Sequence, residues 1–146
     1  MEITEQHIFF DVSARHKKQA LKKIAAYAEQ IQVVTDQKKF FKGLRKREEE
    51  VTTGFGNGVA IPHAKLKEVI KPSVMIIKFS EEVEWDSLDN QPVRLAIVLA
   101  VPDTDAATEH LKLLSQISRQ LMHEEFREGI VNSSSKEEII KLFESV

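Results

Sequence analysis

The sequence has no cysteine, which excludes a disulfide framework and any metal site built on thiolates. Covalent chemistry must therefore use another nucleophile, and histidine is the main candidate. No stretch of about 18 apolar residues could form a membrane-spanning helix. The acidic residues 1–6 lack the basic and apolar segments of a signal peptide. We expect a cytoplasmic protein.

The chain also lacks a large excess of either charge. Its formal net charge is -2, which gives no general attraction to nucleic acid, and we expect no nucleic-acid partner. Its 146 residues, 42% of them hydrophobic, are enough for one domain spanning residues 1–146. None of the histidine spacings matches a metal-binding motif, and we expect neither a metal nor a cofactor.

Helical spacing of apolar residues predicts most of the secondary structure. Thr35 or Asp36 can cap the second helix, and Ser134 and Glu137 have capping-box spacing before the last one. The expected helices cover residues 13–30, 36–50, 108–122, 124–131 and 135–144.

Two apolar stretches, residues 74–79 and 93–101, predict strands. The second is almost continuously apolar, which is typical of a central strand covered on both faces. Residues 82–91 are acidic and polar, and they favour a short strand and a turn. Because strands and helices are interleaved, we expect an α/β fold with a mixed sheet flanked by helices on both faces. The strand order is not readable from the sequence.

Glycine is scarce, with five in the chain, and three of these lie within residues 54–58. This clustering predicts a backbone loop, because glycines at such spacing weaken regular structure. The loop lies between Arg47 and His63, with Thr52 and Thr53 just before it. A guanidinium, hydroxyl groups and accessible backbone N–H groups are the donors that bind phosphate.

His63 follows Pro62, which keeps Ile61 extended and so helps to fix the direction of the imidazole. A neutral imidazole accepts a phosphoryl group well, because its pKa is about 6.5 and one ring nitrogen keeps a lone pair. His63 can therefore act as a nucleophile without a strong base.

Each of these features also has an ordinary structural explanation. The glycine segment is neither a P-loop nor a dinucleotide fingerprint, and alone it is typical of a turn. His63 alone could be a loop or core histidine, and the charged residues 45–50 could be a solvated helix end. His110 starts the apolar stripe of the helix at 108–122, so it is either a core histidine or a group near an anion at the helix N-terminus.

Taken together, Arg47-Glu48 and the stretch Thr-Thr-Gly-Phe-Gly-Asn-Gly-Val-Ala-Ile-Pro-His-Ala at residues 52–64 resemble the signature of fructose/mannitol-type enzyme IIA domains of the bacterial phosphotransferase system. The resemblance covers essentially the whole chain. It implies a mixed sheet between helices, with His63 as the phosphorylated nucleophile and Arg47 and His110 as its partners. We assign phosphate binding to Thr52, Thr53, Gly54, Gly56 and Asn57.

The resemblance also implies the partners. The phosphocarrier HPr would donate the phosphoryl group, and a cysteine of enzyme IIB would accept it for uptake of a fructose- or mannitol-class sugar through membrane enzyme IIC. We expect an exposed apolar rim around His63, including Phe55 and Ile61, for docking. Two alternatives stay open: a nitrogen-type regulatory enzyme IIA, and a module that binds a phosphorylated ligand without turnover.

Overall fold

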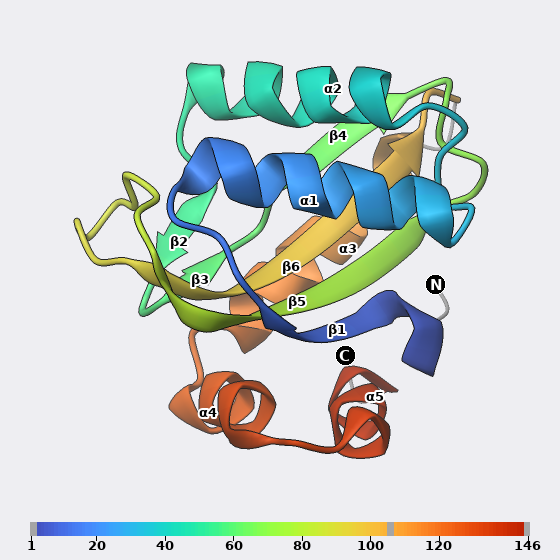
Figure 1. Cartoon of the computed structure of the whole chain (residues 1–146). Coiled ribbons are helices and arrows are strands. Elements are labelled where there is room, and N and C mark those ends of the chain that lie inside the picture. The colour runs from blue at the N-terminus through green and yellow to red at the C-terminus, as the bar shows by residue number, and fades with distance from the viewer. Residues whose placement is uncertain (1–2, 105–106, 145–146) are drawn as a thin grey trace.

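A mixed sheet forms the centre of the molecule (Figure 1), in a computed structural model that describes residues 3–104 and 107–144, with the backbone alone for 107–111. The strand order is β1-β5-β6-β3-β2, and β4 also pairs with β6. The β5 and β6 strands are antiparallel, whereas β1 is parallel to β5, and β3 and β4 are parallel to β6. The strands are β1 (Ile8–Val12), β2 (Gly54–Gly56), β3 (Val59–Ala60), β4 (His63–Leu66), β5 (Ser73–Val83) and β6 (Val93–Pro102).

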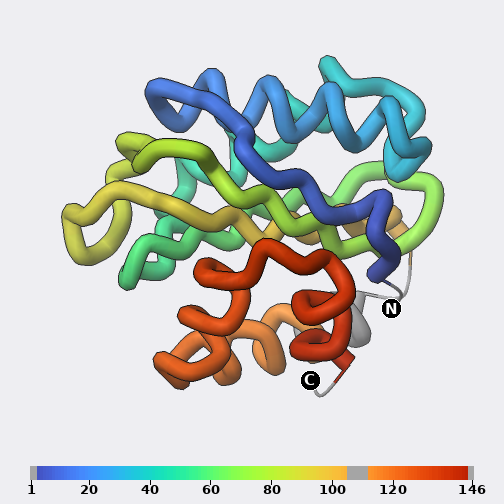
Figure 2. The backbone as a smooth tube through the Cα atoms, turned by 60° about the horizontal axis from the view of Figure 1, so that its bottom comes forward, coloured from blue at the N-terminus to red at the C-terminus, as the bar shows by residue number. Residues whose placement is uncertain are grey.

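Helices cover both faces of this sheet, as expected. The α1 and α2 helices lie side by side on one face, while α4 and α5 lie on the other face (Figure 1). A short 3-10 helix, η1, near the N-terminus contacts α5, and Figure 2 shows these two segments on the same side of the molecule. The bounds are η1 (Glu5–His7), α1 (Lys17–Gln30), α2 (Gln37–Glu50), α3 (Ala107–Gln120), α4 (Glu124–Asn132) and α5 (Lys136–Glu144).

The β6 strand is the central strand that its apolar sequence predicts. Its alternate side chains enter two separate cores, because successive residues of a strand point to opposite faces. Ala96, Val98 and Ala100 pack in the core under α1 and α2. The larger Leu95, Ile97 and Leu99 pack in the other core with residues of α3, α4 and α5. All six side chains are fully buried.

Helix starts follow local capping chemistry. Asp36 caps α2 by accepting a hydrogen bond from the Lys39 amide at 3.1 Å. The cap of α5 differs from the expectation by one residue: Ser135, not Ser134, accepts from the amide of Glu138 at 3.3 Å. No helix in the described ranges is long and apolar enough to cross a membrane.

The glycine segment differs from the expected loop. Gly54–Gly56 forms β2, which pairs antiparallel with β3 across a turn at Asn57 and Gly58. Both turn residues have positive φ angles, 58° and 80°, as a tight two-residue hairpin turn requires. The prediction of an irregular loop was therefore wrong, because Asn-Gly closes a hairpin here. The β4 strand was also not anticipated.

Candidate active site

His63 is the first residue of β4, and it lies half-buried beside the central strand. The β3 and β4 strands follow one another along β6, with Ile61 and Pro62 between them. The Pro62 carbonyl accepts a hydrogen bond from the Leu99 amide at 3.0 Å, which fixes the backbone just before His63. The backbone that carries the imidazole is thus held by the sheet on both sides of the proline.

Hydrogen bonds define which ring nitrogen of His63 carries the proton. Nδ1 lies 2.8 Å from the carbonyl oxygen of Ile61. Because a carbonyl only accepts, Nδ1 must be the donor and carry the hydrogen. Nε2 accepts a hydrogen bond from Nε of Arg47 at 3.1 Å. The lone pair of the neutral ring is therefore on Nε2, directed at a guanidinium.

The surroundings of His63 favour its neutral form. Burial of the ring is the largest effect and lowers its pKa below the ordinary 6.5. The hydrogen bond to Ile61 acts in the opposite direction, the positive charge of Arg47 lowers the pKa further, and the charges of Glu48 and Glu50 raise it. Since the net shift is downward, Nε2 keeps its lone pair at neutral pH.

Arg47 lies in the last turn of α2, and its guanidinium has two acceptors. Besides the bond to His63, Nη1 donates to the carbonyl oxygen of Val51 at 2.7 Å. This second bond anchors the side chain to the end of its own helix. Guanidinium has five N–H donors in a planar fork, so these two bonds leave capacity for an anion beside Nε2.

Thr53 is bonded to Ile61, two residues before His63, and the polar groups of Thr52 and Thr53 have partners within the chain. Thr53 is buried, and its carbonyl accepts from the Ile61 amide at 2.9 Å. Its own amide donates to both carboxylate oxygens of Glu48, at 3.1 and 3.2 Å, and its hydroxyl also bonds to Glu48. The Thr52 hydroxyl accepts from the Gly54 amide at 3.1 Å. Phosphate binding by these residues stays a prediction.

Gly56 and Asn57 lie at the tip of the hairpin, away from the imidazole. Val59 and His63 face Leu95 and Leu99 of β6, and at about 3.3 Å per strand residue they are about 13 Å apart. Asn57 lies farther along, and its amide donates to Asp89 at 2.9 Å. The structure does not bring these two residues to His63, so their assignment to phosphate binding was wrong.

Gly54 has a packing role that the sequence did not reveal. A Cβ at this position would lie 2.7 Å from the Cα of Ser87 and 2.5 Å from its hydroxyl oxygen. The Gly54 carbonyl also accepts from the Leu88 amide at 3.1 Å. Absence of a side chain therefore lets the segment from Glu84 to Pro92, which connects β5 to β6, pack directly on β2.

The expected apolar rim is only partly present. Ile61 is 5% exposed, so its assignment to an exposed rim was wrong, and its side chain belongs to the core instead. Phe55 is half-buried and packs against the same core. Val51, whose carbonyl accepts from Arg47, is an apolar side chain that is 59% exposed at the site. Leu88 is 68% exposed and lies beside Gly54 of the hairpin.

His110 lies in the first turns of α3, as the sequence predicts, but its side chain is outside the described residues.

Sequence reasoning missed Glu48 and Lys17. Glu48 is buried between α1 and α2, and Lys17 Nζ lies 3.5 Å from its carboxylate. Glu48 belongs, with Arg47, to the residues that carry the family resemblance, but nothing in the sequence indicates its burial or its contact with Lys17. Within the described ranges, no group of three or more histidine or acidic side chains could hold a metal ion.

Comparison with known proteins gives a consistent picture. Residues 1–146 match the model of the family described as phosphoenolpyruvate-dependent sugar phosphotransferase system, EIIA 2. The chain is 39% identical over 106 residues to the PTS system fructose-specific EIIA component of Haloferax volcanii, which covers 73% of this chain and 68% of that protein.

Solved structures agree with this match. The nitrogen regulatory protein IIA-Ntr from Neisseria meningitidis has a TM-score of 0.88 and 31% identity, with 95% of this chain and 94% of that chain covered. The IIA chain in a complex of enzyme IIAMTL and phosphorylated enzyme IIBMTL from Escherichia coli has a TM-score of 0.83. Its identity is 19% over 99% of each chain, so this second likeness concerns the fold alone.

Proposed function

The chain belongs to the EIIA 2 family of the phosphoenolpyruvate-dependent sugar phosphotransferase system and is a phosphotransferase component, and from that membership we propose that it carries a phosphoryl group on Nε2 of His63. The observation that carries the proposal is the orientation of the imidazole. Nδ1 is 2.8 Å from the Ile61 carbonyl, and the lone pair on Nε2 is directed at Arg47.

The proposed reaction exchanges one bond for another at phosphorus. Nε2 of His63 bonds to the phosphorus of phospho-HPr while the phosphorus–nitrogen bond of the donor breaks, and that electron pair returns to the donor ring. The His63 ring gains positive charge, which the Ile61 carbonyl stabilises through the Nδ1–H bond. In the next step a cysteine thiolate of enzyme IIB forms a bond to phosphorus and Nε2 recovers its lone pair.

Arg47 has to change its contact during this exchange. Its Nε–H occupies the lone pair of Nε2, so that hydrogen bond must break before phosphorus can approach. Phosphoryl transfer has a loose transition state with charge spread over the equatorial oxygens. A guanidinium anchored at Val51 is well placed to shift its N–H groups to those oxygens, which lowers the barrier.

We assign HPr as donor, enzyme IIB as acceptor and membrane enzyme IIC as the indirect partner that moves a fructose- or mannitol-class sugar. This assignment draws on the fructose-specific name of the Haloferax relative and on the complex with phosphorylated enzyme IIB in the Escherichia coli neighbour. The donor is charged from phosphoenolpyruvate, so we place the reaction in the cytoplasm.

A second candidate function is regulation through phosphorylation-dependent protein binding. Its support is the similarity of 95% of this chain, at 31% identity, to a protein named nitrogen regulatory protein IIA-Ntr from Neisseria meningitidis. Both functions use the same phosphorylated histidine. They differ in whether the phosphoryl group moves on to enzyme IIB.

Incubation with phosphoenolpyruvate, enzyme I, HPr and candidate enzyme IIB proteins tests both proposals. We expect stoichiometric label on the chain and its loss when the cognate enzyme IIB is added. Label that stays on the chain with every enzyme IIB would favour regulation. Absence of label from phospho-HPr would contradict the carrier function itself and would leave the binding module.

A further inference from the structure

Glu48 is an unusual acid, because it is buried next to the proposed catalytic arginine. Its side chain is 4% exposed. A buried carboxylate is costly unless hydrogen bonds and an opposite charge compensate for lost hydration. Both kinds of partner are present: Thr53 donates its amide and its hydroxyl, and the Lys17 ammonium lies 3.5 Å away.

These contacts continue along the backbone to the imidazole. Glu48 holds Thr53, and the Thr53 carbonyl accepts a hydrogen bond from the Ile61 amide at 2.9 Å. The Ile61 carbonyl in turn lies 2.8 Å from Nδ1 of His63. A series of hydrogen bonds, joined through the backbone of Thr53 and of Ile61, therefore links the carboxylate of Glu48 to the nitrogen that defines the tautomer of His63.

The two ring nitrogens of His63 are linked to neighbouring residues of one helix, α2. Arg47 reaches Nε2 of His63 from one side, at 3.1 Å, while Glu48 reaches Nδ1 through Thr53 and Ile61 from the other side. Because Arg47 and Glu48 are adjacent in the last turn of α2, the position of that turn sets the distance between guanidinium and imidazole.

We propose that Glu48 is a positioning residue for phosphoryl transfer, which holds His63 against Arg47 through Thr53, and that Lys17 supports it by neutralising its buried charge. This inference rests on the proposed function of His63. Glu48 and Lys17 do not touch the reacting atoms, so neither is a catalytic residue.

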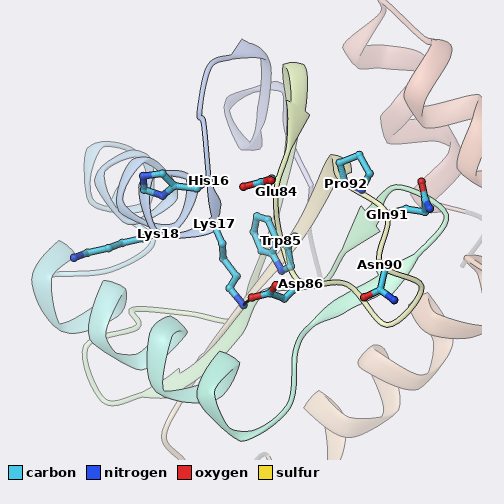
Figure 3. A pocket seen from close by; sticks show the side chains of 9 residues that line it. All are labelled: His16, Lys17, Lys18, Glu84, Trp85, Asp86, Asn90, Gln91 and Pro92. Atoms are coloured by element: carbon cyan, nitrogen blue, oxygen red, sulfur yellow. Dashed lines mark ion pairs between the residues drawn. The ribbon is translucent and has the colours of Figure 1, made fainter.

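Lys17 lies at the start of α1, where it borders an open pocket of about 500 Å³ between that helix and the segment that connects β5 to β6. Figure 3 shows its side chain extending towards Asp86, at 4.0 Å. The Asp86 side chain is 93% exposed, so this ion pair contributes little. The pair with buried Glu48 is the one that matters, since water screens it far less.

A purely structural role for Glu48 would lower stability and leave the site of each folded molecule unchanged. The test must therefore measure folded protein. Two readouts serve: the single-turnover rate of transfer from phospho-HPr, and the ¹⁵N chemical shifts of the His63 ring, which report how the proton is shared between Nδ1 and Nε2.

The variants separate charge from geometry. Glu48→Gln keeps the volume but loses the charge, Lys17→Met loses only the ammonium, and Thr53→Val removes a hydroxyl with no change of charge. We expect each to slow transfer by roughly 10- to 100-fold, the scale of small displacements of reacting groups, and to shift the ring away from the pure Nδ1–H tautomer. Lys17→Arg and Thr53→Ser should restore most of the rate.

Matched controls are available at the adjacent positions. Lys18→Met and Glu49→Gln remove exposed charges next to the proposed residues, and both should keep the wild-type rate and spectrum. Should Glu48→Gln fail to fold, Lys17→Met and Thr53→Val decide alone, because neither removes the buried carboxylate.

The proposal would be overturned if folded Glu48→Gln kept the wild-type rate and the wild-type ¹⁵N shifts. If Glu48→Gln does not fold, the same result in Lys17→Met and Thr53→Val would overturn it. Equal slowing by Lys18→Met would do the same, since it would make the effect one of general charge. If the wild-type chain accepts no label from phospho-HPr, the proposed function fails, whereas the ¹⁵N spectra still decide whether Glu48 positions His63.

Discussion

Nε of Arg47 lies 3.1 Å from Nε2 of His63, although 16 positions separate the two residues in the sequence. One belongs to the last turn of α2 and the other begins β4. The same guanidinium is tied to the Val51 carbonyl at 2.7 Å, so its placement beside the ring does not depend on the imidazole alone. The arrangement keeps a positive charge where a phosphoryl group would form.

Arg47→Ala should slow phosphoryl transfer and leave the fold intact. Loss of one preorganised donor corresponds to about 2–4 kcal/mol of transition-state stabilisation. Arg47→Lys should be intermediate, because it keeps the charge but loses the planar fork. Since the charge of Arg47 lowers the pKa of His63, Arg47→Ala should also raise that pKa, and an NMR titration of the ring measures the change. Unchanged rates with both HPr and enzyme IIB would refute this role.

Phosphorylation should occur on Nε2 and not on Nδ1, because Nδ1 donates to the Ile61 carbonyl at 2.8 Å. Coupling between ³¹P and ¹⁵N in the phosphorylated, ring-labelled protein identifies the nitrogen directly. His63→Ala should abolish the acid-labile label. A phosphoryl group found on Nδ1, or undiminished label in the alanine variant, contradicts the assignment.

His110 is predicted to orient the phosphoryl group from the start of α3, although its side chain lies outside the described residues. His110→Gln keeps a polar donor and should retain part of the transfer rate, whereas His110→Ala should lose much more. A core histidine would behave differently: both variants would melt at lower temperature with normal rates per folded molecule. Single-turnover rates measured beside melting temperatures distinguish the two roles.

The fold was largely predictable, because its main signals are local. The apolar sequence of β6 requires cover on both faces, and the helical periodicities provide it. The short strands β3 and β4 were not predictable in this way. They contain few residues and gain their pairing from β6, a contact that no local pattern encodes. The hairpin at Asn57-Gly58 did have a local signal, since Asn-Gly favours a two-residue hairpin turn, but the clustered glycines around it are also typical of an irregular loop.

The site was predictable only in part. The resemblance of residues 47–64 indicated Arg47 and His63, and the structure brings these two side chains together. Glu48 belongs to the same stretch but was given no role, because an acid at a helix end is usually solvated. Its burial depends on Lys17 and Thr53, which belong to other segments of the chain. The placement of Gly56 and Asn57 at the hairpin tip likewise depends on the pairing of β2 with β3.

Gly54→Ala should destabilise the protein, since the new Cβ would lie 2.7 Å from the Cα of Ser87 and backbone atoms would have to move. Overpacking of this kind costs about 1–3 kcal/mol. Gly43→Ala is a suitable control, because the nearest neighbours of its Cβ would be side-chain atoms of Leu66 and Ala64, the first at 3.0 Å. Thermal unfolding of both variants measures the difference. Equal melting temperatures would contradict the close packing of β2 against Ser87.

The lowered pKa of His63 should make both activity and stability depend on pH. The transfer rate should fall as the pH drops below 6.5 and through the pKa of the folded protein, because protonated Nε2 has no lone pair to attack phosphorus. In the unfolded chain the pKa of His63 is about 6.5, above its pKa in the folded protein. Between these two pKa values the unfolded state therefore binds more protons than the folded state. The free energy of unfolding therefore rises with pH across that window, and this contribution is complete above about 6.5 and lost as the pH falls.

Comparison with His63→Gln isolates this contribution from the other histidines. Urea unfolding from about pH 7.5 to about pH 5.5 should show a steeper loss of stability for the wild type than for the variant, because glutamine does not titrate. The variant lacks the hydrogen bonds of the imidazole and should be less stable than the wild type at the upper end of this range. The quantity of interest is the slope, since the lost bonds shift the variant's curve by a nearly constant amount. Parallel curves for the two proteins would mean that folding leaves the pKa of His63 unchanged, and the neutral, buried nucleophile would have to be abandoned.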